Sequence, residues 1–495
     1  MKKTLLIVTL VCGLIASAVV LGESRTWTDS TGKYEIKGEF VEFRDGKVWL
    51  KKDDGGTIGV PMSRLSSADQ MFVREELKRR REGASPIAGG VAAPNTNNGA
   101  VGDWPQWRGP ARDGLSRETG LLDRWDAPPP ILWQAHNLGG GMSSLVVADG
   151  RVFTMGVRRD GAELIALDAE DGGELWSLEV GGGKPNCTPT VDGDLVFALG
   201  RDGDLVCADV ADGREIWRKK FSRDFGGKMM SGWGYSESPL VDGDRLICTP
   251  GAPDAMIAAL DRRTGETIWA SPAPTKTRGN DGAGYSSIVV SQAAGEKQYV
   301  QLIGCGVVGV RAEDGRPLWY YGDIANGTAN VPTPIVKGDY IFCSSGYGDG
   351  GTALLKIQRR GDEFQAQQVY YKKASELQNH HGGMVLVGDY VYMGHGHNNG
   401  LPVCVELMTG RAVWGPLRGP GRESAAVVYA DGHLYFRYQD GVMALIEATP
   451  EEYRPKGSFE IATRHDNSWP HPVIADGRLY LRDQQDLHVY DIRRK

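Results

Sequence analysis

The chain has 495 residues, of which 41% are hydrophobic, so it is long enough to bury a large core and to carry a second, small domain. Its formal net charge of −7 provides no basic field, which argues against nucleic acid as a partner. The 68 glycines follow no collagen-like period and fit a chain with many tight turns.

Residues 1–22 are expected to be a secretory signal peptide. Lys2 and Lys3 precede a mainly apolar run over residues 5–21, the usual order of such a signal. The run is at the short limit for a membrane span, so membrane association through an uncleaved signal anchor stays open as the alternative. Either form predicts an exported protein, periplasmic or at the cell surface.

Residues 23–82 predict a small β-domain. Short runs of strand-forming residues alternate with turns such as Asp45-Gly46, which is typical of a β-meander. Ser66 followed by Asp69 is a capping pattern that predicts the start of a helix.

This domain resembles the first homology domain of the Sla endocytic adaptors, an SH3-like barrel. The matching residues are Arg25–Asp29, Gly32–Tyr34, Gly38–Phe40, Gly46–Leu50, Val60-Pro61 and Leu65-Ser66. The resemblance implies a peptide- or protein-binding module, and a β-barrel spacer is the alternative.

Residues 83–102 predict a flexible linker, since they are rich in Gly, Ala, Pro and Asn and lack apolar periodicity. A lead-in segment follows. Its Trp104, Trp107 and Arg108 are expected to pack against the side of the next domain and not against a ligand.

From about residue 143 a sequence motif, called the phrase below, repeats to the C-terminus. Two clear copies end at Ala166–Trp176 and Ala259–Trp269, and each reads Ala-Leu-Asp, then Gly four residues after the Asp, then Trp. Seven Asp-Gly or Gly-Asp turns and a degenerate copy at residues 286–319 give eight copies of roughly 40 to 50 residues. Their period-two pattern predicts four-stranded antiparallel sheets. Residues 103–495 therefore predict an all-β, eight-bladed β-propeller.

The two ends of the repeat region are expected to meet. The last copy stops after Asp491 and lacks its final strand, whereas an extra strand of that kind, residues 131–133, precedes the first complete copy. Completing the last blade with this strand would remove free sheet edges.

The Asp and Trp of the phrase are expected to be structural. Asp stabilises a turn, and Trp is a large apolar plate that a bare glycine backbone can approach. These docking positions are Asp168, Asp209 and Asp261, with Trp133, Trp176, Trp217, Trp269, Trp319 and Trp414. The phrase resembles the tryptophan-docking repeat of the PQQ-like propeller family, which includes quinoprotein alcohol dehydrogenases and BamB-type proteins. That resemblance implies the fold and does not by itself imply a function.

Quinoprotein enzymes use pyrroloquinoline quinone (PQQ), and the resemblance implies two marks of it: an adjacent Cys-Cys pair and a Glu/Asn/Asp calcium site. The sequence contains no Cys-Cys pair, and no convincing calcium trio is recognisable. The cofactor is therefore unknown, PQQ is unsupported, and no catalytic residue is assigned. Six cysteines are expected to be buried, small apolar residues: Cys187, Cys207, Cys248, Cys305, Cys343 and Cys404.

One cluster of residues predicts a ligand site. In a propeller, the loops before the innermost strands and the loops between second and third strands emerge on one face, so distant residues should meet there. The candidates are His380, His381, His395, His397, Trp233, Tyr235, Glu237, Arg422, Trp469 and His471. Three interpretations stay open: a polar channel rim, a small-ligand site, and a transition-metal site on the imidazoles, although no metal ligand set is assigned.

The sequence as a whole predicts an exported, non-catalytic binding or scaffold protein. It would use the propeller and the SH3-like module for contacts with a protein or peptide partner. The alternative is a PQQ-dependent quinoprotein oxidoreductase, and support of polymer binding or degradation is a third class.

Overall fold

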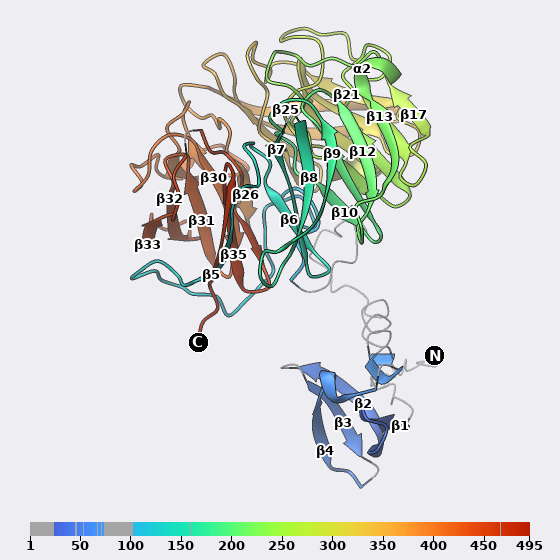
Figure 1. The fold of residues 1–495 in the computed structure, drawn as a ribbon. Helices are drawn as coiled ribbons and strands as arrows, with labels where there is room; N and C mark the ends of the chain where they lie inside the picture. The colour runs from blue at the N-terminus through green and yellow to red at the C-terminus, as the bar shows by residue number, and fades with distance from the viewer. Residues whose placement is uncertain are drawn as a thin grey trace, which may run out of the picture. The chain divides into compact units, whose positions relative to one another are not determined.

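The computed structural model of the protein describes residues 24–44, 47–52, 54–66, 68–70, 72–73, 102–159, 161–465 and 467–495. The chain divides into two compact units, Met1–Gly90 and Val91–Lys495. Strands dominate both units, which confirms the all-β class (Figure 1). No helix within the described ranges is long and apolar enough to cross a membrane. The predicted signal peptide lies outside these ranges, as does almost all of the predicted linker.

The N-terminal unit contains one four-stranded antiparallel sheet, coloured blue in Figure 1. Its strands pair in chain order: β1 (Arg25–Thr28), β2 (Glu35–Arg44), β3 (Lys47–Lys52) and β4 (Thr57–Pro61), followed by the 3₁₀ turn η1 (Met62–Arg64). Alternation along β3 turns two of its side chains inward, where they join the core residues Trp27, Phe40, Val48, Leu50, Leu65 and Val73.

The helix predicted after Ser66 begins there. The Ser66 hydroxyl accepts a hydrogen bond from the Asp69 amide at 3.2 Å and donates to the Asp69 carboxylate at 2.8 Å, which confirms the capping pattern. Asp69 is 3% exposed, and it also accepts hydrogen bonds from Arg25 at 2.7 Å and from the Thr28 amide. One buried carboxylate therefore ties the helix start to the sheet.

The C-terminal unit contains eight four-stranded antiparallel sheets within its described residues, numbered here in chain order. The first is β6 (Leu145–Ala148), β7 (Arg151–Arg158), β8 (Gly161–Asp168) and β9 (Glu174–Gly181); the second is β10 (Thr190–Asp192), β11 (Leu195–Leu199), β12 (Asp204–Asp209) and β13 (Glu215–Lys220); the third is β14 (Leu240–Asp242), β15 (Arg245–Cys248), β16 (Ile257–Asp261) and β17 (Thr267–Ser271); the fourth is β18 (Val289–Ser291), β19 (Gln298–Ile303), β20 (Gly306–Arg311) and β21 (Pro317–Tyr321).

The second half continues the pattern. The fifth sheet is β22 (Ile335–Lys337), β23 (Tyr340–Ser345), β24 (Gly351–Arg360) and β25 (Glu363–Lys373); the sixth is β26 (Met384–Val387), β27 (Tyr390–His395), β28 (Leu401–Glu406) and β29 (Ala412–Trp414); the seventh is β30 (Ala425–Ala430), β31 (His433–Tyr438), β32 (Val442–Glu447) and β33 (Pro455–Glu460); the eighth is β34 (Val473–Ala475), β35 (Arg478–Asp483), β36 (Asp486–Asp491) and β5 (Ile131–Ala135). Two short helical turns, α2 (Phe221–Asp224) and η2 (Ala293–Gly295), interrupt the strands.

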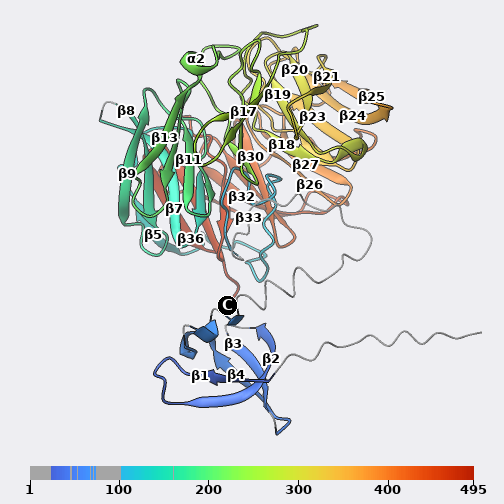
Figure 2. The same cartoon turned by 90° about the vertical axis from the view of Figure 1, so that its right-hand side faces the viewer.

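The eighth sheet joins the two ends of the repeat region. Strand β5 pairs antiparallel with β36 (Figure 2). In this register Trp133 lies opposite Val489. The prediction that an early strand completes the last sheet is therefore confirmed. A strand more than 300 residues away in sequence supplies the hydrogen-bonding partner that β36 would otherwise lack.

Neighbouring sheets lock together at the repeated Trp. The Trp133 indole N–H donates to the Ala169 carbonyl at 3.0 Å, and Trp176 and Trp217 repeat this contact with the carbonyls of Val210 and Arg262. Each acceptor is the residue after the Asp of the next sheet. A glycine turn lies against each ring, and a Cβ on Gly172, Gly213 or Gly265 would come within 2.4 to 2.8 Å of it. The Asp side chains cap the same turns, as in the 2.8 Å bond from the Ala211 amide to Asp209.

The docking positions are less uniform than the sequence phrase predicts. Trp133, Trp269, Trp319 and Trp414 are buried, whereas Trp176 and Trp217 are half-buried. The Trp269 indole N–H has no partner because Arg245 occupies the equivalent carbonyl, that of Ala312. In the fifth sheet, which lacks the Trp, Tyr370 takes its place: its hydroxyl donates to the Leu407 carbonyl at 2.8 Å and its ring lies against Gly410.

The lead-in segment runs across the first strands of several sheets. Trp104 bridges to Val147 of β6, the Pro105 carbonyl accepts from Val191 of β10, and Leu115 bridges to Tyr429 of β30. Arg112 donates to the carbonyls of Ser238 and Pro239, just before β14. Since the first strands of several sheets contact this segment, it forms an internal floor beneath them. The expectation that it packs against the side of this domain is wrong.

Candidate functional site

An inner cavity of about 380 Å³ opens above this floor. Its walls come from the loops that precede first strands, which bring Trp233, Tyr285, His380, His381 and Trp469, and from the loops between second and third strands, which bring Tyr347 and His397. The lead-in segment adds Trp107 and Arg108. The two kinds of loop therefore meet, although up to several hundred residues separate them in sequence.

Five rings of this cavity form a continuous aromatic cluster, which we define as Tyr347, His380, His381, His397 and Trp469. The His380 and His381 rings stack with centroids 3.6 Å apart and planes 24° apart. His397 lies 4.3 Å from His380, and Trp469 lies 4.4 Å from His381. Tyr347 lies 4.8 Å from His380 and closes the cluster on the side of the fifth sheet. The arrangement is a set of ring faces and edges against which a flat group can pack.

Hydrogen bonds fix the orientation of these rings. The Tyr347 hydroxyl lies 3.1 Å from His381 Nε2, and His380 Nδ1 lies 2.7 Å from the Ser424 hydroxyl. The Trp469 indole donates to the Gln439 side chain at 2.6 Å. Side chains held in this way lose little further freedom when a ligand binds.

Three imidazoles of the cavity, those of His380, His381 and His471, are electrically neutral at physiological pH. Burial lowers the pKa of His381 to about 4, and that of His380 to about 2, where His381 and His397 add to the effect. Burial, with a contribution from the Arg108 charge, lowers the pKa of His471 to about 3. Neutral rings keep one nitrogen as donor and one as acceptor.

Arg108 supplies positive charge at the floor. Its side chain is 4% exposed, and its Nη2 donates to the carbonyls of Asp113, at 2.9 Å, and Met384. Burial lowers the pKa of Arg108 only to about 10, so it stays charged. No Asp, Glu or Lys is among the cavity-lining residues that the structure describes, which leaves Arg108 as the one formal charge of that lining.

Six of the ten predicted site residues line the inner cavity: Trp233, His380, His381, His397, Trp469 and His471. The other four do not, and the prediction is corrected for them. Tyr235 turns away to pack on Phe221, with ring centroids 5.1 Å apart, and donates to the Pro250 carbonyl.

Glu237 is 1% exposed and faces Thr249, whose amide and hydroxyl donate to it at 2.6 and 2.9 Å. Burial raises its pKa to about 8. His395 ends β27 and accepts from the Gln378 amide, and Arg422 is exposed outside the cavity. Position in a loop therefore does not decide which side chains face the cavity: the neighbours His380 and His381 both line it, whereas of His395 and His397 only His397 does.

The metal interpretation gains no support from the geometry. Among the described residues, no three His, Cys, Asp or Glu side chains come together in a way that could hold a metal ion. The six cysteines are buried free thiols, which confirms their prediction as small buried residues. Stacked imidazole faces, as in His380 and His381, do not direct their nitrogens to one point.

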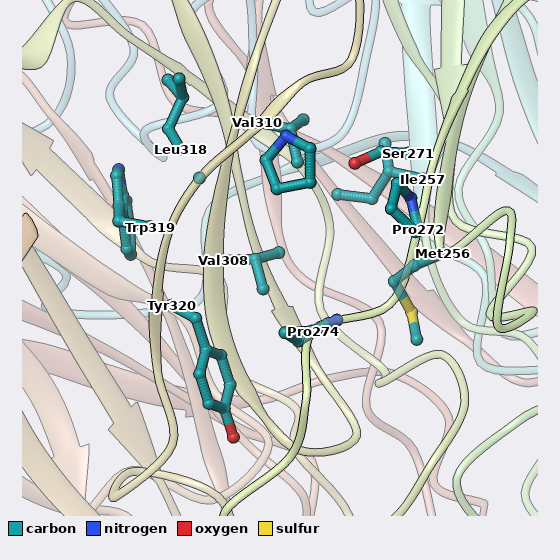
Figure 3. Close-up of a pocket in the computed structure, with 12 residues that line it drawn as sticks. Met256, Ile257, Ser271, Pro272, Pro274, Val308, Val310, Leu318, Trp319 and Tyr320 are labelled. Atoms are coloured by element: carbon teal, nitrogen blue, oxygen red, sulfur yellow. The ribbon is translucent and has the colours of Figure 1, made fainter. Parts of the chain in front are cut away.

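A second hollow, of about 190 Å³, lies between the third and fourth sheets (Figure 3). Met256, Ile257, Val308, Val310 and several prolines line it, beside Trp319 and Tyr320. The Tyr320 hydroxyl is already used, since it donates to the Cys305 carbonyl at 2.8 Å. With so few polar groups, this hollow offers no chemistry, and the inner cavity remains the candidate site.

The sequence candidates leave out several cavity residues, among them Tyr347 and, in the lead-in segment, Trp107 and Arg108. The signal that could have found the last two is the density of Trp, Arg and Gly in residues 104–109, which is unusual for a simple connector. The repeat phrase could not place this segment, because it lies outside the repeats.

Two family matches cover most of the chain. The family described as outer membrane protein assembly factor BamB matches residues 120–203 and 180–415. SLA1 homology domain 1 matches residues 21–81. Both resemblances seen in the sequence are therefore confirmed.

Individual relatives are distant. The outer membrane protein assembly factor BamB of Shewanella oneidensis is 24% identical over 269 residues, which is 51% of this chain and 63% of that protein. The chain thus spans somewhat less than two thirds of that relative. The crystal structure of BamB from Moraxella catarrhalis has a TM-score of 0.53 at 16% identity and covers 74% of this chain and 99% of that one. A europium-containing methanol dehydrogenase has a TM-score of 0.57 at 13% identity, covering 77% and 89%. These likenesses show a fold shared by BamB and quinoprotein propellers.

Proposed function

We propose that this chain, which belongs to the family described as outer membrane protein assembly factor BamB, is an exported, non-catalytic binding protein. The observation that carries the proposal is the family match, which extends over more than half of the chain. The described part of the inner cavity supports it, because its rings and amides suit recognition.

The proposed architecture is finer than the likeness to known folds. We infer that the eight sheets are the blades of one closed propeller over residues 103–495, sealed by the pairing of β5 with β36. Residues 23–82 would form an SH3-like barrel for peptide or protein contacts, joined by a linker over residues 83–102. Residues 1–22 would direct export to the periplasm or cell surface.

A quinoprotein cofactor makes specific demands on the cavity. A PQQ–calcium unit requires oxygen ligands for a hard cation, chiefly carboxylates. No carboxylate is among the described residues that line the cavity, and the sequence has no adjacent cysteines. The residues present do not fit this cofactor, and we derive no reaction from it.

Deleting the gene in its native host tests the proposal. If the protein serves assembly in the manner its family name states, quantitative mass spectrometry should show reduced outer-membrane proteins, restored by the full chain. Unchanged levels would rule out that role. Absorbance spectra of the purified protein with PQQ and calcium form a separate arm. A bound, redox-active quinone would overturn the non-catalytic assignment.

A further inference from the structure

We infer that the inner cavity binds a small, ring-bearing organic carboxylate, with the acid group at Arg108 and the ring against the aromatic cluster. This inference rests on the proposed binding function and specifies a ligand class for it. Arg108 and the aromatic cluster, which come from separate parts of the chain, carry the argument.

The charge of the cavity decides between ligand classes. Arg108 is the only charged residue among the described residues lining it, and Asp113 is the single opposite charge that raises its pKa. Nη2 of Arg108 bonds two backbone carbonyls, so no carboxylate neutralises it through a hydrogen bond. A buried guanidinium without an ion-pair partner favours an anion and disfavours a cation.

Unsatisfied polar atoms lie around this charge. Nε and Nη1 of Arg108 are buried without a hydrogen-bond partner, as is Nδ1 of the adjacent His471. Leaving a buried donor unpaired costs about 1–3 kcal/mol, and more when the group is charged. Because Nη2 already donates to two carbonyls, and Nε and Nη1 do not share one edge of the guanidinium, a carboxylate would accept a single charge-assisted hydrogen bond from one of these two free nitrogens.

Gly383 leaves room for the Arg108 guanidinium and the His471 imidazole to lie side by side. A Cβ on Gly383 would stand 2.1 Å from Arg108 Nη1 and 2.8 Å from the His471 ring. Any larger residue at this position would therefore displace both polar groups. The bare backbone is what allows the guanidinium and the imidazole to lie together at the floor.

The ring of the ligand is inferred from the walls. Trp107 stands 4.5 Å from His471 at the floor, and the aromatic cluster lies above it. The indole of Trp107 donates to Thr333 at 3.3 Å, so it is held like the rings of the cluster. Fixed aromatic faces bind flat groups at low entropic cost.

Several residues that line the inner cavity have backbone conformations with positive φ. Arg108 and Tyr347 have φ values of 61° and 64°, and Asn398 and Asn467, which also line the cavity, have φ of 50°. Residues other than glycine adopt this region at a cost, and such positions concentrate at functional sites. The strain at Arg108 and Tyr347 is independent of the charge argument, whereas Asn tolerates this region more readily.

Calorimetric titration of the full-length protein tests the inference. The probes are benzoate, phenylacetate and indole-3-acetate, each paired with its neutral amide. We expect at least one acid to bind about tenfold or more tightly than its amide, because only the acid pairs with the guanidinium. Equal binding of acid and amide, or no binding of any pair, would overturn the inference.

Two variants locate the site. Arg108→Gln should remove the preference for the acid, whereas Arg422→Gln, an exposed arginine outside the cavity, should leave it unchanged. If Arg108→Gln fails to fold, Gly383→Ala replaces it and should weaken the acid by the same displacement. An acid preference that survives both variants would contradict the assignment to Arg108. Acid binding without any effect of gene deletion on outer-membrane proteins would leave this site standing and refute the assembly role.

Discussion

The seam between neighbouring sheets and the wall of the inner cavity are built from the same repeated copies but obey different rules. At the seam, equivalent residues make equivalent contacts, as when Trp133, Trp176 and Trp217 each reach the carbonyl after the next Asp. At the cavity, equivalent loops carry unlike residues: Trp233, Tyr285 and His380 each precede a first strand. The seam reuses one geometry at several junctions, with exceptions such as Trp269, whereas a ligand site needs a single asymmetric set of groups.

The largest effect on the contacts between sheets is expected from removing β5, the strand that completes the eighth sheet. Deleting residues 102–140 takes away β5 and the internal floor, so β36 loses its partner and the first strands lose their shared contacts. We expect aggregation and no cooperative melting transition, measured by size-exclusion chromatography and differential scanning calorimetry.

The matched control is deletion of residues 23–95, which removes the separate N-terminal unit and should leave the melting transition of the C-terminal unit in place. A monomeric product of the first deletion that melts at the wild-type temperature would refute the closure.

Loss of a buried tryptophan between two sheets should lower the free energy of unfolding far more than loss of an exposed tryptophan that lines the cavity. Trp133 is 8% exposed and packs on Gly172, so Trp133→Ala should cost about 3–5 kcal/mol of unfolding free energy. Trp233 is 57% exposed, and Trp233→Ala should change stability by no more than about 0.5 kcal/mol. Urea unfolding measures both, and similar costs for the two would mean that seam and mouth are not distinct.

Glycine substitutions separate docking from turn geometry. Gly213 and Gly193 both have positive φ, 74° and 61°, but a Cβ on Gly213 would come 2.4 Å from the Trp176 ring whereas one on Gly193 meets nothing within 4 Å. Alanine at Gly193 should cost about 1–2 kcal/mol for the backbone alone. Alanine at Gly213 should cost about 1–3 kcal/mol more from overpacking. The difference between the two unfolding free energies is the docking contribution, and a difference near zero would show that the ring is free to move away.

Sequence predicts the seam well and the cavity only in part, for a physical reason. Repetition makes the Asp, Gly and Trp positions visible, and even the exception Tyr370 keeps the same contact with another side chain. The rule that two kinds of loop share one face brought His380 and His397 together correctly. Which side chain of a loop turns inward depends on its packing partners, Phe221 for Tyr235 and Thr249 for Glu237, and the sequence does not show these contacts. Arg108 lies outside the repeats, and only the folded lead-in segment shows where it goes.

The smallest expected effect is the pH dependence of stability contributed by the cavity. Burial lowers the pKa of His471 to about 3 in the folded protein, whereas the unfolded chain has the ordinary value of about 6.5. Between these two values the unfolded state binds the extra proton, so stability rises with pH and is lost as pH falls below about 6.5. The loss amounts to at most about 1.4 kcal/mol per pH unit for this one group.

Glutamine does not titrate, so His471→Gln should flatten the pH dependence of the unfolding free energy between pH 6 and pH 5 relative to the wild type. Urea titrations at both pH values give the two slopes. Because the Arg108 charge contributes to the lowered pKa, a bound carboxylate at Arg108 should raise the pKa of His471 and reduce the wild-type slope as well. A wild-type slope equal to that of His471→Gln would show that this imidazole is hydrated in the folded state, and the enclosed floor of the inner cavity would have to be revised.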